Sequence, residues 1–109
     1  MSVAQARRLW VADRAKPQPS TRFVDSRTIE DYSGGHIPGA RHLSLGELAQ
    51  RGAADPLPGS GKIVVYGADP GSPAAMGLAK RLIALGCDDV YLLQGGLLSW
   101  RTNGGELEK

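Results

Sequence analysis

The segment 62–86 constrains the fold of this chain more than any other part of the sequence. It begins with the apolar run KIVVY (62–66), which is typical of a buried strand, and continues into the glycine- and proline-containing loop GADPGS (67–72). Ser72 followed by Pro73 is a favourable N-cap and first-turn pair. Leucines and alanines then recur at helical spacing for about 13 residues, up to Gly86 as a natural C-cap. The pattern predicts a strand that delivers a loop to the N-terminus of a helix.

The rest of the chain repeats this alternation of strands and helices. Apolar spacing predicts an amphipathic helix over about residues 3–13, and Ser26 or Thr28 can cap a brief helix after the strand TRFVD. The other expected elements are a short strand at Leu43 and Leu45, a helical turn over 46–51, a strand over 90–93 and a last helical turn through Trp100. Because most strands are apolar throughout, we expect an α/β fold with a parallel sheet covered on both faces.

Composition narrows the class of protein. A chain of 109 residues with 41% apolar and 22% charged residues is expected to form one domain, 1–109, without a membrane span. Residues 1–22 hold five basic residues against Asp13 alone, which we interpret as a solvated helix face rather than a nucleic-acid site. No secretory signal is visible, so a cytoplasmic protein is expected. The single cysteine, Cys87, excludes an internal disulfide and a Cys/His zinc cluster.

Three segments of the chain carry recognisable motifs in a characteristic order and spacing. The first, FVDSRTIEDYSGGHIPGARHLSL, contains a strand that ends in Asp-x-Arg and an aromatic residue four positions before His-Ile-Pro-Gly-Ala, and it resembles the first signature of the rhodanese-like domain family. KIVVYGADPGSPAAMGLAKRLIALGCDDVYLL is similar to the active-site strand, loop and helix, and GGLLSW to the second signature. The resemblance covers about residues 21–103. It implies a doubly wound α/β domain with a mainly parallel five-stranded sheet, and relation to sulfurtransferases that carry sulfur as a cysteine persulfide.

The resemblance places Gly67 in the position of the family's nucleophilic cysteine. The rest of this degenerate loop contains no replacement thiol: Ala68, Asp69, Pro70, Gly71, Ser72. A loop at a helix N-terminus favours a thiolate because unpaired N–H groups and the helix dipole stabilise negative charge. Glycine has no side chain to receive that stabilisation. The absence of an arginine, the prolines and Asp69 also make the loop a weak cradle for an anion.

Two other residues carry groups that could act as nucleophiles. Cys87 follows the far end of the predicted helix, about 20 Å from the loop, where the dipole disfavours a thiolate, so we interpret it as a small buried core residue. The hydroxyl of Ser72 needs a base, and the loop offers none beyond Asp69, which makes an N-cap the better interpretation.

A few further residues mark the expected pocket. Asp25 and Arg27 follow the first strand at the carboxyl edge of the sheet, where open α/β sheets bind ligands, although a structural hydrogen-bonding role is favoured for the pair. With Gly67 and Ser72 they form the candidate pocket. His36 is expected to fix its loop by a hydrogen bond, and no metal site is predicted.

The sequence therefore predicts a catalytically inactive rhodanese-like domain that acts as a binding or regulatory module. The expected partner is a protein or a small-molecule ligand, and no cofactor is expected. Two alternatives remain open. One is an enzyme, either a sulfurtransferase that uses Cys87 or a partner's thiol or a different activity in the altered pocket, and the other is a structural or oligomerisation domain.

Overall fold

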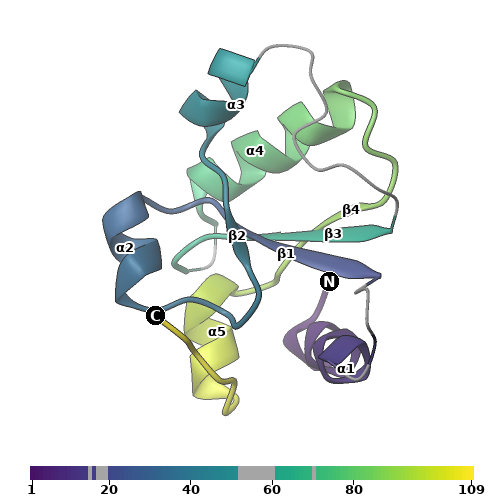
Figure 1. Cartoon of the computed structure of the whole chain (residues 1–109), viewed down its shortest axis with the longest axis vertical. Helices are drawn as coiled ribbons and strands as arrows, with labels where there is room; N and C mark the ends of the chain where they lie inside the picture. Colours follow the sequence, from purple (N-terminus) through teal and green to yellow (C-terminus); the bar gives the residue numbers. More distant parts are fainter. Residues whose placement is uncertain (15, 17–19, 52–60, 70) are drawn as a thin grey trace.

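The computed structural model describes residues 1–14, 16, 20–51, 61–69 and 71–109. The sheet within these residues has four parallel strands in the order β2-β1-β3-β4 (Figure 1). The strands are β1 (Thr21–Asp25), β2 (Arg41–His42), β3 (Lys62–Tyr66) and β4 (Val90–Leu92). This arrangement confirms the α/β class with a parallel sheet. The expectation of five strands is corrected to four within the described residues.

The second strand also differs from its predicted position. Arg41 and His42 pair with Val24 and Asp25 of β1, whereas Leu43 lies just beyond β2 and Leu45 begins a helix. The Leu43 amide still donates to the Asp25 carbonyl at 3.0 Å. Leu43 is fully buried. It is apolar because it packs in the core, although it is not part of the strand.

Helices cover both faces of the sheet, as the doubly wound arrangement requires. The helices are α1 (Val3–Arg14), α2 (Ile29–Gly34), α3 (Leu45–Arg51), α4 (Pro73–Ala84) and α5 (Gly96–Thr102). In Figure 1, α3 and α4 lie above the sheet and α1 and α5 below it. Within the described residues, no helix combines the length and the apolar character needed to cross a bilayer.

Successive residues of the central strands contribute alternately to two hydrophobic cores. Val24 and Val65 pack with the leucines of α3 and α4, while Phe23 and Val64 pack with α1 and α5. In the second core the ring of Trp100 meets Phe23 and Trp10 edge to face, at centroid distances of 5.9 and 5.7 Å. This edge-to-face geometry is favourable for aromatic pairs and fixes α5 against the sheet.

The end of α1 is fixed to the start of β1 by a buried carboxylate. Asp13 accepts hydrogen bonds from the Thr21 amide at 2.7 Å and the Ser20 hydroxyl at 3.0 Å, and Lys16 lies 3.3 Å away. Burial opposes the charge of Asp13, but these contacts outweigh burial and lower its pKa. Asp13 therefore stabilises the fold as an anion.

The helices α2, α3, α4 and α5 each follow one of the four parallel strands, so their first turns surround the carboxyl edge of the sheet. Thr28 caps α2 by accepting from the Asp31 amide at 3.2 Å, and Ser72 caps α4. Gly95, the N-cap of α5, and Gly96, its first residue, have φ of 80° and 61°, values that glycine adopts without strain. The carboxyl edge is the place where the sequence predicted a functional loop.

Candidate functional site at the carboxyl edge

The loop 67–72 leaves β3 at this edge and is fixed by the first turn of α5. The amides of Leu97 and Leu98 donate to the carbonyls of Gly67 and Ala68 at 2.9 and 3.0 Å. Gly96 packs so closely that a Cβ there would lie 2.7 Å from the Gly67 carbonyl oxygen. Two amides at the start of α5 therefore bind loop carbonyls and are not directed at a ligand.

The space beside Gly67 is filled by Ser72. A Cβ built on Gly67 would lie 2.3 Å from the Ser72 Oγ and 2.4 Å from its Cβ, well inside the ordinary range of contact. Gly67 is not among the glycines with positive φ, so its backbone conformation is compatible with a side chain. Packing by Ser72, and not backbone strain, therefore opposes a larger residue at position 67.

Ser72 also uses hydrogen-bond donors at the start of α4. Its Oγ accepts from the Ala75 amide at 3.4 Å and its carbonyl accepts from the Met76 amide at 3.1 Å, while Pro73 has no N–H group. The exposed Asp69 adds a negative charge to the same loop. An anion at this position would meet two amides that already bind Ser72, a proline without an N–H group and an adjacent carboxylate.

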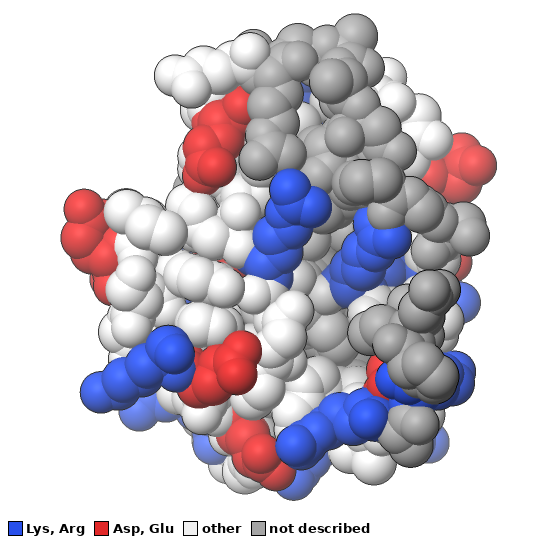
Figure 2. Space-filling view, viewed as in Figure 1, with Lys and Arg blue, Asp and Glu red and all other residues white. Residues whose placement is uncertain are grey.

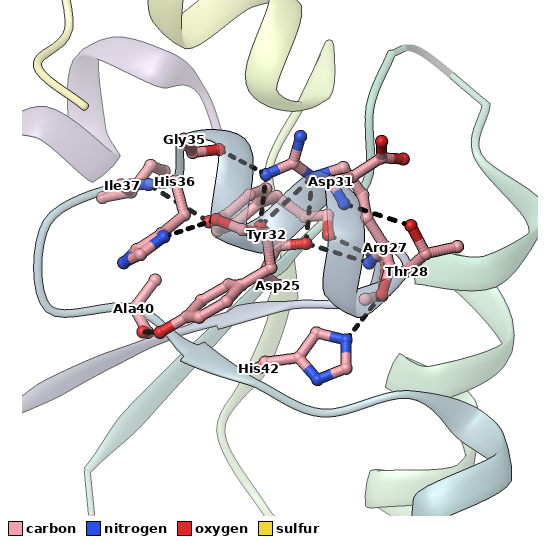
Figure 3. A network of polar contacts seen from close by, with 12 residues as sticks. Asp25, Arg27, Thr28, Asp31, Tyr32, Gly35, His36, Ile37, Ala40 and His42 are labelled. Carbon is pink, nitrogen blue, oxygen red and sulfur yellow. Dashed lines mark hydrogen bonds and ion pairs between the residues drawn. The ribbon is translucent and has the colours of Figure 1, made fainter. Parts of the chain in front are cut away.

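Asp25 and Arg27 form a buried ion pair beside the loop (Figure 3). The Asp25 side chain is fully buried and accepts from the Arg27 Nε at 3.0 and 3.1 Å and from its Nη2 at 2.7 Å. The same Nη2 donates to the Gly35 carbonyl at 2.7 Å. Burial opposes the charge of Arg27, but its hydrogen bond and ion pair with Asp25 outweigh burial and raise its pKa. Arg27 is thus held by protein groups, and 12% of its side chain remains exposed.

Tyr66, the last residue of β3, binds the segments on both sides of this ion pair, a role that sequence reasoning missed. Its carbonyl accepts from the amide and hydroxyl of Ser26 at 3.1 and 2.9 Å, and its buried hydroxyl accepts from the Ile37 amide at 3.2 Å. Burial raises the pKa of the Tyr66 phenol, and the nearby Asp25 carboxylate acts in the same direction. The register that pairs Asp25 with Tyr66 was the missing signal, because it exists only once the strands are aligned.

Tyr32 lies between two histidines, also shown in Figure 3. The rings of Tyr32 and His36 stack with centroids 3.8 Å apart, and the ring of His42 lies 5.4 Å away at a tilt. His36 Nδ1 bonds the Tyr32 carbonyl at 2.8 Å, and His36 Nε2 faces the Glu108 carboxylate at 3.2 Å. His42 bonds the Arg27 carbonyl at 2.7 Å through Nε2. These contacts hold the segment 27–42 together at the carboxyl edge. The contact of His36 with Glu108 also joins the C-terminal residues to this segment.

Cys87 lies beyond the opposite end of α4 from the loop. The helix has 12 residues and therefore spans about 18 Å. Cys87 is half-buried against the core shared by β3 and α4, and its amide donates to the Leu82 carbonyl at 3.0 Å. The expectation that Cys87 is buried is corrected to partial burial, and its distance from the loop agrees with the sequence estimate.

The structure thus brings together Gly67 with Ser72 and Asp25 with Arg27, and the β1–β3 register places both contacts at the same edge. Pro70 of the predicted loop lies outside the described residues. Two surface hollows of 590 and 530 Å³ lie along α1 and not at the loop.

The fold matches that of known proteins. The rhodanese-like domain family matches residues 8–103, so the chain belongs to that family. The thiosulfate sulfurtransferase GlpE of Pseudomonas aeruginosa is 34% identical over 93 residues, which cover 80% of this chain and 81% of GlpE. The rhodanese-like domain of the Alr3790 protein from Anabaena superposes with a TM-score of 0.79 at 28% identity, covering 99% of this chain and 76% of that one.

Another relative is a transcriptional regulator. The HTH-type transcriptional regulator Rv0324 of Mycobacterium tuberculosis is 36% identical over 92 residues. The match covers 84% of this chain but 39% of the regulator, so the chain spans well under half of that protein's length.

Proposed function

We propose that this rhodanese-like domain is a pseudoenzyme, without sulfurtransferase activity, and that it works as a binding or regulatory module. The observation that carries the proposal is the filled space at Gly67. The family reaction needs a thiolate at the start of the loop, and here the corresponding residue has no side chain while Ser72 occupies its volume. The single cysteine suits a reducing compartment, and we propose a cytoplasmic location.

The electrostatics of the loop support the same proposal. A persulfide site is stabilised by open amides at a helix N-terminus. In this chain the amides of Ala75 and Met76 donate hydrogen bonds to Ser72. The amides of Leu97 and Leu98 donate to carbonyl groups of the loop. Arg27 is held by Asp25 and Gly35. A transcriptional regulator among the relatives supports a regulatory role for a domain of this kind.

Thiocyanate formation from thiosulfate and cyanide tests the proposal, with the Pseudomonas aeruginosa GlpE protein as a positive control. We expect the wild-type chain and its Cys87→Ser variant to stay at the rate without protein. Mass spectrometry after incubation with thiosulfate should likewise show no adduct of about 32 Da, the mass of one transferred sulfur. Turnover well above background would refute the proposal. Its loss in Cys87→Ser, together with the adduct, would establish the alternative of a Cys87-dependent sulfurtransferase.

A further inference from the structure

Exposed apolar side chains gather around the carboxyl edge. Among the described residues, seven large hydrophobic side chains are exposed, and four of them lie in the first turns of the helices that follow the strands. These four are Ile29 of α2, Leu45 of α3, Met76 of α4 and Leu98 of α5, with exposed fractions of 52, 44, 41 and 54%. The remaining three, Val11, Ile83 and Leu107, lie in α1, in the last turn of α4 and in the C-terminal segment.

Contacts connect three of these residues to the degenerate loop or its helix. The Leu98 amide bonds the Ala68 carbonyl and the Met76 amide bonds the Ser72 carbonyl. Leu45 lies against α4, since its Cδ2 would be 3.4 Å from a Cβ on Gly77. Ile29 follows Arg27 by two residues at the start of α2. The four residues therefore lie in helix first turns at the edge where the family's catalytic pocket would open.

The charges at this edge select a cationic occupant. Glu30 and Asp31 lie in the first turn of α2, and Asp69 lies in the loop. All three are exposed and form no ion pair with any described residue. Figure 2 shows acidic side chains over α2 at the left of the molecule. Carboxylates suit helix N-termini, but they also repel an anion approaching the loop. Arg41 of β2 is an exposed cation near this edge.

The size of the edge favours a polypeptide over a small molecule. Four parallel strands at a spacing of about 4.8 Å extend over about 14 Å, which is the length of about ten helical residues. The loop that follows β3 presents small exposed residues, among them Ala68 and Gly71. Exposed apolar side chains distributed over this length fit the apolar face of a partner's helix better than they fit a buried ligand.

We propose that the carboxyl edge docks a basic amphipathic helix of a partner protein. Its apolar side chains would cover Ile29, Leu45, Met76 and Leu98, and its lysines or arginines would face Glu30, Asp31 and Asp69. The inference rests on the proposed function, because it uses the catalytic edge of the family as a protein interface. It also reverses the charge of the ligand, from an anionic sulfur donor to a cationic surface.

Titration of the ¹⁵N-labelled chain with designed helical peptides tests the proposal. The probe carries leucines on one face and lysines on the other, and the comparison peptide has every lysine replaced by glutamate. We expect the lysine peptide to bind, and its shift changes to concentrate in residues 27–31, 45–47, 67–77 and 97–98. Binding should weaken as salt is added. The absence of binding, equal binding of the glutamate peptide, or shift changes confined to α1 would overturn the proposal.

Surface variants supply matched controls that leave the buried contacts intact. The double variant Met76→Gln/Leu98→Gln should weaken binding of the lysine peptide by about tenfold, because two central apolar contacts are lost. The double variant Val11→Gln/Ile83→Gln removes two equally exposed apolar side chains elsewhere and should bind like the wild type. Equal weakening in both pairs would refute the assignment. Failure of the proposed function would appear separately, as thiocyanate turnover.

Discussion

Restoring a thiol at position 67 should require a second change at position 72. In Gly67→Cys, the new Cβ would lie 2.3 Å from the Ser72 Oγ, so Ser72 must move and its cap on α4 is lost. Loss of a serine N-cap costs about 1 kcal/mol, and overpacking a filled site adds about 1–3 kcal/mol. We therefore expect this variant to lose about 2–4 kcal/mol in free energy of unfolding.

The double variant Gly67→Cys/Ser72→Gly removes the clash and keeps a tolerated N-cap, since glycine costs only a few tenths of a kcal/mol relative to serine. The next contact of the new Cβ, with the Ala75 Cβ, is 3.4 Å and needs only a small adjustment. We expect the double variant to be more stable than the single variant. Its introduced thiol should also titrate below about 8, because the Ala75 amide is released at the start of α4.

Urea unfolding and the pH dependence of thiol alkylation provide the assay. Both variants are made in the Cys87→Ser background, so that one thiol is present, and Cys87→Ser alone is the reference. The reasoning is refuted if Gly67→Cys is as stable as the reference, or if adding Ser72→Gly lowers its stability further. Either result would mean that Ser72 does not control access to this position.

Three other substitutions test the contacts that form the edge. Arg27→Ala should destabilise by about 3–5 kcal/mol in urea unfolding, because it leaves the buried Asp25 carboxylate without its partner. Gly96→Ala should cost about 2 kcal/mol by the same measurement, since φ is 61° and the new Cβ meets a loop carbonyl at 2.7 Å, whereas Gly34→Ala, with open space around its Cβ, should be close to neutral. Asp13→Asn should cost about 2 kcal/mol at pH 7. Because the pKa of this carboxyl is lowered in the folded state, its stabilisation is present above its ordinary pKa and is lost as pH falls, so the unfolding free energies of wild type and variant should converge in acid.

Local patterns predicted the elements whose residues pack or cap within a short stretch. The run 62–66 forms β3 as expected, and Ser72 with Pro73 begins α4. The strand β2 was misplaced because its two residues, Arg41 and His42, are polar and become a strand only by pairing with β1. A strand defined entirely by a distant neighbour has no periodicity of its own to detect.

The candidate site could likewise be predicted only in part from the sequence. The absence of a cysteine from the loop 67–72 follows from the sequence alone, because it depends only on residue type. The filling of that position by Ser72 could not, since it depends on the path that the loop takes back to its own start. The contact of His36 with Glu108 could not be predicted either, because the two residues are 72 positions apart in the sequence.

The contact between Gly67 and Ser72 also bears on how this lineage can change. A cysteine introduced at residue 67 by one mutation would enter occupied space, so natural selection would meet a weakened fold before any gain in chemistry. The reverse order, with Ser72 shortened first, offers no catalytic advantage on its own. Acquisition of a thiol at this position is therefore obstructed along each single-step route, and we expect descendants of this domain to retain the glycine while the surrounding surface diverges.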